Sequence, residues 1–397
     1  MNPKTSRRNS CGHTAAEKCS RTKLTGMISA GVRIGLTCGL FITSIFSGQA
    51  AAYDRPLTYE TSRSLGMGGV SVAIADDQQA LFCNPAGLGL RTTSAYSVLS
   101  ATAQRSEDYD AVNDHIDSLS DSDTPGARAG NYRNLMQIMG KSGHQSWSSM
   151  AYYLGGTGFG IAAMHRESED FSVENPASPL VRSRVDKDTV LAGSFARSQK
   201  ETQILFKDRA TGWWGGTMKF VSRKTADHTF YARDFAALSP QALKDTDRTG
   251  VAVDFDLGAL WQLNNPWQTT IGLFAGNLLN SDFSEEAGKL KRQFAAGVAI
   301  KPLTGPPERN EKLLLAADYW ETGEDKSGLS NLRLGMQLRL SRHLQLLAGL
   351  RGGYPTGGLA FTWHDLKIQA ANYAEELGQR PGEREDRRTA VSALLEF

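Results

Sequence analysis

SRSLGMGGVSVAIADDQQALFCNPAGLG, residues 62–89, is the stretch that decides the fold of this chain. It joins a glycine cluster, a pair of carboxylates and a proline corner, at Gly66, Gly68 and Gly69, at Asp76 and Asp77, and at Asn84, Pro85 and Ala86. Glycine lets backbone pack where no side chain fits, and proline fixes φ and keeps the residue before it extended. These features predict a compact element that packs closely against other backbone.

The residues in front of this stretch predict a secretory signal peptide over residues 1–52. A basic segment precedes a short apolar core, Ile34 to Phe46, and small residues allow cleavage after Ala52. The core is shorter than the roughly 20 residues that a spanning helix needs. A retained anchor and lipid attachment at Cys38 remain as alternatives, and Met27 would start a leader of ordinary length.

The mature chain is slightly acidic. Removing residues 1–52 removes seven basic residues and one acidic residue, which leaves 37 Lys and Arg against 41 Asp and Glu. The formal net charge of +2 therefore comes from the leader, and no basic patch predicts a nucleic-acid partner. Cys83 is the one cysteine left, so it cannot form a disulfide within the chain, and we expect it to be buried as a small apolar residue.

Apolar and polar residues alternate in short segments from Ser94 to the end of the chain. We predict about 14 β-strands there, at residues 94–104, 146–154, 157–166, 188–198, 213–223, 250–263, 268–277, 292–301, 311–320, 329–340, 343–351, 357–363, 365–374 and 388–397. The leader is not followed by any long apolar run, so membrane-spanning helices are not expected. Alternation fits a soluble β-sandwich as well as a membrane barrel, but an even number of strands favours an all-β, single-chain antiparallel barrel over residues 94–397.

In such a barrel, one face of each strand meets lipid and the other lines the lumen. The strand over 250–263 shows this most clearly, because its odd positions are apolar and its even positions are mostly polar or small. The charged residues on the polar faces of this strand and of two later ones are Asp254, Asp256, Arg333, Arg339 and Arg351. We predict that these five residues face the lumen and that the carboxylates pair with the arginines across it.

The ends of the strands carry further signals. The last strand ends on Phe397, and a terminal phenylalanine on an amphipathic strand resembles the signal that outer-membrane barrel assembly recognises. Longer insertions with helical spacing, as expected of outer loops, lie at Asp108–Leu119, Asn131–Lys141 and Tyr231–Lys244. Tryptophans lie at or near strand ends, where they would form an aromatic girdle or be buried in a core, at positions 147, 213, 214, 261, 267, 320 and 363.

Catalytic and metal-binding motifs are absent from the sequence. The histidines are scattered without HxxxH or HxH spacing, and no G-x-S-x-G turn occurs. Asp254 and Asp256 share one strand face, but two carboxylates are too few to hold a cation. We therefore expect no catalytic residues, no bound metal, no cofactor and no enzymatic activity.

The stretch over residues 62–89 also closely resembles the amino-terminal signature of the FadL/PorV superfamily, over Leu65–Gly69, Ala73–Asp77 and Ala80–Leu88. Its members are outer-membrane barrels of about 14 strands, among them uptake channels for fatty acids and hydrocarbons and a component of type IX secretion. The carboxyl-terminal part looks most like the uncharacterised TraF-like members, over Tyr373–Gly378, Pro381–Gly382 and Asp386–Arg388.

The resemblance implies that residues 53–93 fold into the barrel as a hatch that contains Asn84, Pro85 and Ala86 and acts as a fixed seal or as a gate. It implies a place in the outer membrane of a Gram-negative cell, with outer-membrane lipid and the barrel-assembly machinery as partners. The expected function is a passive channel or uptake protein for hydrophobic or small compounds, with a hydrophobic small molecule as ligand. The alternative is a structural or interaction barrel that serves secretion, conjugation or surface attachment.

Overall fold

The computed structural model describes residues 59–119, 124–174, 180–199, 210–231, 248–284, 287–303, 312–321, 328–378 and 380–397. The predicted leader, residues 1–52, lies outside these ranges, as does nearly all of the helix predicted over Tyr231–Lys244. Within these ranges, no helix combines the length and the apolarity needed to cross a membrane.

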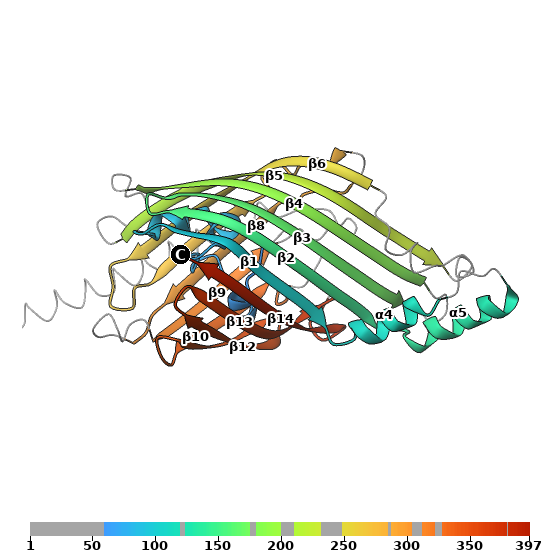
Figure 1. The fold of residues 1–397 in the computed structure, drawn as a ribbon. Helices are drawn as coiled ribbons and strands as arrows, with labels where there is room; N and C mark the ends of the chain where they lie inside the picture. The colour runs from blue at the N-terminus through green and yellow to red at the C-terminus, as the bar shows by residue number, and fades with distance from the viewer. Residues whose placement is uncertain are drawn as a thin grey trace, which may run out of the picture. The chain divides into compact units, whose positions relative to one another are not determined.

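Antiparallel strands form one closed barrel (Figure 1). Each strand pairs with the next along the chain, and the last strand pairs with the first. The strands are β1 (Ala95–Ser106), β2 (Ser142–Gly155), β3 (Phe159–Glu174), β4 (Leu180–Gln199), β5 (Ala210–Tyr231), β6 (Arg248–Leu263), β7 (Thr270–Gly276), β8 (Gln293–Ile300), β9 (Leu313–Glu321), β10 (Leu332–Arg339), β11 (Leu344–Arg351), β12 (Tyr354–Trp363), β13 (Leu366–Glu376) and β14 (Glu385–Glu396). The predicted all-β fold, an antiparallel barrel, is confirmed.

Three strands, β3, β4 and β5, extend furthest beyond their predicted bounds. β3 extends to Glu174, β4 begins at Leu180 and β5 reaches Tyr231. Charged residues at Glu167, Glu169, Lys187 and Lys224 interrupt the apolar face of these strands, so the alternation that marks a membrane strand stops before the strand does, although Phe171, Val173 and Val181 beyond them are buried. Side-chain contacts help to hold the extensions together: Thr225 Oγ1 donates a hydrogen bond to Asp186 Oδ1 at 2.6 Å.

β6 shows how the barrel wall is built. Val251, Phe255 and Leu257 point outward and are 48%, 40% and 52% exposed, whereas Asp254 and Asp256 between them are fully buried on the inner face. Side chains of a strand alternate between its two faces. The outer face of the barrel is therefore apolar, and the inner face carries polar groups.

Two helices lie in the connection between β1 and β2, at the end of the barrel away from the carboxyl terminus (Figure 1). α4 spans Tyr109–Asp117, as predicted, and α5 spans Pro125–Gln137 instead of the predicted Asn131–Lys141. The earlier start of α5 follows from its cap, because Thr124 Oγ1 accepts a hydrogen bond from Ala127 N. Both helices bury apolar side chains against the extended ends of β3 and β4.

The amino-terminal residues 59–94, which we call the plug, lie inside the barrel (Figure 1). The plug contains α2 (Ser62–Gly66), α3 (Ala80–Cys83) and a 3-10 helix, η1 (Pro85–Leu90). It belongs to the segment predicted as a hatch over residues 53–93, of which residues 53–58 lie outside the described ranges. The plug and the wall around it form the candidate functional site.

Candidate functional site

Glycines bring the plug backbone into direct contact with the backbone of the wall. Gly68 and Gly69 have φ values of +72° and +85°, in the region that favours glycine. A Cβ atom on Gly68 would lie 2.6 Å from the carbonyl oxygen of Leu350, and one on Gly349 of β11 would lie 2.5 Å from Gly68 N. Both positions therefore require glycine.

The wall repeats this arrangement around the plug. Inward-facing strand glycines, which we call the wall glycines, have plug atoms within 3.0 Å of where a Cβ would stand: Gly160, Gly215, Gly258, Gly272, Gly335 and Gly349. A Cβ on Gly215 would lie 2.8 Å from Ala86 N, and one on Gly272 would lie 2.9 Å from the carbonyl carbon of Val72. The plug fits the wall too closely to leave room for a methyl group at these points.

Gly349→Ala should therefore lower the free energy of unfolding by about 1–3 kcal/mol, because the added methyl group overpacks the contact with the plug. Gly357→Ala is the matched control, since a Cβ there would meet no atom closer than Leu347 O at 3.9 Å. The measurement is the urea midpoint of the purified, reconstituted barrel. Equal midpoints for the two variants would contradict the close fit.

The Asn84-Pro85-Ala86 corner ties the plug to itself and to the wall. Asn84 is fully buried, and its Oδ1 accepts a hydrogen bond from Ala86 N at 3.2 Å. Its Nδ2 donates to the carbonyl oxygens of Val72 in the plug, at 2.8 Å, and Ala259 in β6, at 3.3 Å. Pro85 then begins η1 at a position where its missing N–H costs nothing. The corner thus joins two turns of the plug to one strand.

The acidic pair is held within the plug by Arg63. Arg63 Nη1 lies 2.6 Å from Asp76 Oδ1 and 3.2 Å from Asp77 Oδ2. Arg63 Nε donates a hydrogen bond to Gln337 Oε1 of β10 at 2.9 Å. Asp77 Oδ1 also accepts a hydrogen bond from Gln79 N at 2.9 Å. Asp76 and Asp77 therefore shape the plug, and Arg63 links them to the wall.

Glu60 anchors the start of the plug to a cluster of charged wall residues. Its carboxylate lies 2.9 Å from Arg333 Nη1 and 2.8 Å from Arg351 Nη1. The cluster continues through Glu375, which lies 2.8 Å from Arg351 Nη2 and 3.1 Å from Arg388 Nη1. Burial raises the pKa of Glu60, but Arg351 and Arg333 outweigh it and leave that pKa below its ordinary value. Glu60 is therefore charged at neutral pH.

Hydrogen bonds fix the rest of the plug to strands on several sides. Asp318 of β9 accepts from the backbone N–H groups of Ser71 and Val72 at 2.6 and 2.9 Å. The other wall partners are Thr217 of β5, Thr356 of β12 and Ser392 of β14, which contact Leu81 O at 3.0 Å, Gly66 O at 3.0 Å and Ser62 Oγ at 2.5 Å. The plug is thus bonded to strands around the barrel.

The two aspartates of β6 face the lumen but do not pair with the arginines. Asp256 lies 2.8 Å from Lys219 Nζ of the neighbouring strand, and Asp254 accepts from Leu279 N and Ser281 N at 2.9 and 3.1 Å. The predicted pairing across the lumen is wrong, because the plug fills that space and supplies Glu60 to the arginines instead.

Arg339 lies half-buried at the end of β10 and does not join the cluster around Glu60. Its backbone N–H donates to Lys312 O at 2.8 Å. Phe397 lies at the seam between the first and last strands: its backbone pairs with Tyr96 of β1 in both directions, at 2.9 and 3.0 Å, and the two rings stack with centroids 5.4 Å apart. Phe397 therefore extends the seam that closes the barrel.

One side of the lumen is apolar, which the sequence did not predict. Inward-facing side chains of β2–β6 form one buried cluster with the plug residues Leu81 and Phe82, namely Met150, Met164, Val190, Val221 and Ala252. Apolar residues occupy both faces of β2 and β3 here, so the inner set is hard to separate from the outer one by pattern alone. The lumen therefore has an apolar cluster on the inner faces of β2–β6, which we call its apolar side. On β4–β6 this cluster is bordered by the buried ion pairs Arg223–Asp188 and Lys219–Asp256. A second group of buried charges lies at β10–β14.

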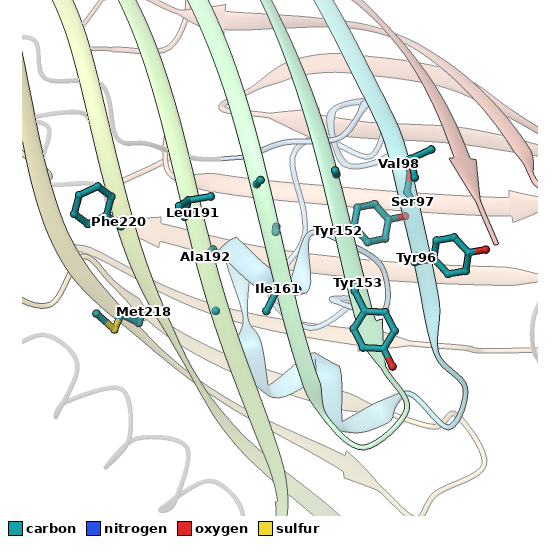
Figure 2. Close-up of a pocket in the computed structure, with 14 residues that line it drawn as sticks. Tyr96, Ser97, Val98, Tyr152, Tyr153, Ile161, Leu191, Ala192, Met218 and Phe220 are labelled. Carbon is teal, nitrogen blue, oxygen red and sulfur yellow. The ribbon is translucent and has the colours of Figure 1, made fainter.

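A groove crosses the outer face of the wall behind this apolar side, with a volume of about 670 Å³. Small residues, Ala151, Ala163 and Gly193, make its floor, and Ala151 and Ala163 are direct neighbours on β2 and β3. Larger side chains stand around them, as Figure 2 shows for Tyr96, Tyr153, Ile161, Leu191, Met218 and Phe220. The outer face is therefore hollowed where these small residues lie side by side.

The tryptophans divide between the two predicted roles. Trp147, Trp214, Trp267 and Trp363 are between 43% and 59% exposed, as in an aromatic girdle. Trp320 is buried on the inner face, with Arg333 stacked over its ring at 4.7 Å. Within the described residues, no three His, Cys, Asp or Glu side chains come together as metal ligands.

No protein-family model matches the chain, and no curated protein matches it by sequence. Among solved structures, the P. putida toluene transporter TodX matches at 12% identity with a TM-score of 0.48, over 85% of this chain and 97% of that one. The Ralstonia pickettii toluene transporter TbuX matches at 11% with 0.46, over 85% and 98%. A Pseudomonas aeruginosa FadL homologue matches at 11% with 0.43, over 85% and 97%. The likeness to TraF-like members stays a prediction.

Proposed function

We propose that this protein is a passive uptake channel of the outer membrane for small apolar compounds. The observation that carries the proposal is the apolar side of the lumen, where Met150, Met164, Val190 and Val221 face inward. Flexible methionine side chains adapt to apolar ligands of different shapes. A pore for polar solutes would be lined by polar side chains instead.

A place in the outer membrane is supported by the surface of the barrel. The outward-facing residues of β6, β10 and β11 are apolar and exposed, which fits contact with lipid. Long connections, including α4 and α5, gather at one end, while β2 and β3 are joined by a short turn at the other. This asymmetry, together with the predicted signal peptide, is typical of outer-membrane barrels.

The plug is proposed to stay in place as a fixed seal while compounds pass beside it. Its contacts with the wall support this, and so does an irregularity in β1. The register of β1 shifts between Ser97 and Leu99 against β14 and between Ser97 and Ser100 against β2, and the other described strand pairs show no such shift. A bulge locally disrupts the hydrogen-bond ladder. Sideways release at this bulge, next to the apolar lumen, would need no movement of the plug.

Polar replacements on the apolar side of the lumen should slow uptake. Met150→Gln together with Met164→Gln places two amides where an apolar compound would lie, and an unpartnered buried amide costs about 1–3 kcal/mol. We expect uptake of labelled toluene by cells to fall about tenfold, with unchanged amounts of folded barrel in the outer-membrane fraction.

The matched control replaces the same two methionines by leucine, which keeps the surface apolar and should keep uptake. Heat-modifiable electrophoretic mobility verifies that each variant is folded. If cells with and without the intact protein take up toluene and laurate at the same rate, the transport proposal fails and the structural or interaction barrel becomes the better account.

A further inference from the structure

The outer face of β2–β5 changes from apolar to charged within a few residues of the groove. Ala151, Ala163, Leu191 and Phe220 are cross-strand neighbours on this face. Four residues further along the same strands, on the same face, the neighbours are Trp147, Glu167, Lys187 and Lys224. At about 3.3 Å per residue, this charged row lies about 13 Å from the apolar one.

Lys187 and Lys224 stand directly opposite each other on β4 and β5. Like charges in that position repel and destabilise a sheet. Glu167 offsets only part of this charge: its Oε1 lies 3.8 Å from Lys187 Nζ, and its Oε2 accepts a hydrogen bond from Trp147 Nε1 at 3.1 Å. Lys224 has no ion pair within the described part of the chain. The two ammonium groups therefore share the charge of one carboxylate, which leaves the pair with a net positive charge.

We propose that Lys187 and Lys224 bind the phosphate group of a membrane lipid whose acyl chain lies in the groove. The chemistry fits at both ends, because two ammonium groups meet a phosphate and an apolar groove meets a hydrocarbon chain. Trp147, which is 43% exposed beside the charged row, is the type of residue found where lipid meets water. The separation of about 13 Å lets one lipid reach both parts.

The site is tested by native mass spectrometry of the intact protein in detergent, with added phosphatidylglycerol or phosphatidylcholine of the same acyl chains. The unchanged protein should retain phosphatidylglycerol about tenfold more than phosphatidylcholine, since two lysines act on the anionic headgroup. Lys187→Gln with Lys224→Gln should remove this preference. Lys312→Gln with Arg342→Gln is the control, because it removes the same charge at the other end of the barrel and should keep the preference.

A second variant tests the groove. Ala151→Phe with Ala163→Phe fills its floor on the outer face and should reduce retention of both lipids, with folding verified by heat-modifiable mobility. Three outcomes would overturn the proposal: equal retention of the two lipids by the unchanged protein, an undiminished preference in the lysine variant, or loss of bound phosphatidylglycerol on adding millimolar inorganic phosphate. The last would mean that the lysines hold a free anion instead of a lipid.

Discussion

Glu60→Ala is expected to free the start of the plug and to lower the free energy of unfolding by about 3–5 kcal/mol, because it leaves buried Arg333 without its carboxylate partner and Arg351 with Glu375 alone. Arg333 and Arg351 are only 12% and 14% exposed, and both contact this one carboxylate. We expect a lower urea midpoint and, in planar bilayers, ion-conducting openings that the unchanged protein lacks.

Glu107→Ala is the control for Glu60→Ala, since Glu107 is exposed and lies outside the cluster of charges. It should leave both the midpoint and the conductance unchanged. A Glu60→Ala barrel as stable and as electrically silent as the control would contradict the anchoring role of Glu60.

The same contact should depend on pH. The pKa of Glu60 is lowered in the folded protein. A lowered pKa adds stability above the unfolded-state value, and this stability is lost as the pH falls through the folded-state value. The contact should therefore hold at neutral pH and weaken only below the ordinary range for glutamate. In Glu60→Gln, which cannot titrate, the part of the acid-induced drop in urea midpoint that is due to Glu60 should be absent.

Asp256→Ala is expected to destabilise the barrel by about 3–5 kcal/mol, because it leaves the buried ammonium group of Lys219 without its counter-ion. Lys219 and Asp256 are 2% and 0% exposed, and Lys219 Nζ also donates to Asn277 Oδ1 at 2.7 Å. That second contact is neutral and cannot replace the carboxylate. The urea midpoint of the reconstituted protein measures the loss.

The double variant Lys219→Met with Asp256→Leu shows whether the instability comes from an unpaired buried charge or from lost side-chain packing. It removes both charges and keeps apolar volume, so it should be clearly more stable than Asp256→Ala. A double variant as unstable as the single one would show that the charge is not the cause.

The strands were the most predictable part of the fold. Apolar residues such as Val251 and Leu257 must face outward at every second position, and that period is visible in a single sequence. The extensions of β3–β5 were missed because charged residues such as Glu167 and Lys187 interrupt the apolar period, and because the contacts that hold the extensions, such as Thr225 with Asp186 and Phe171 with the helices, form only in the folded chain.

The contacts of the plug were harder to foresee. The sequence singled out Gly68, Gly69 and Asn84, but not the wall glycines that receive them, because a glycine in a strand looks the same whether it faces lipid or a backbone. Glu60 lies just outside the stretch over residues 62–89, and its two arginine partners are 273 and 291 residues away in the chain. Only the closed barrel brings these groups together.

A disulfide between the plug and the wall tests whether the plug stays fixed in place during uptake. Ser62 in α2 and Ser392 in β14 have their Oγ atoms 2.5 Å apart, so cysteines there should be close enough to join. The variant is Ser62→Cys with Ser392→Cys, with Cys83→Ala added to remove the buried thiol. A fixed plug should give equal toluene uptake by cells with the oxidised and the reduced protein. Loss of uptake on oxidation, restored by reduction, would contradict it and show that the plug moves.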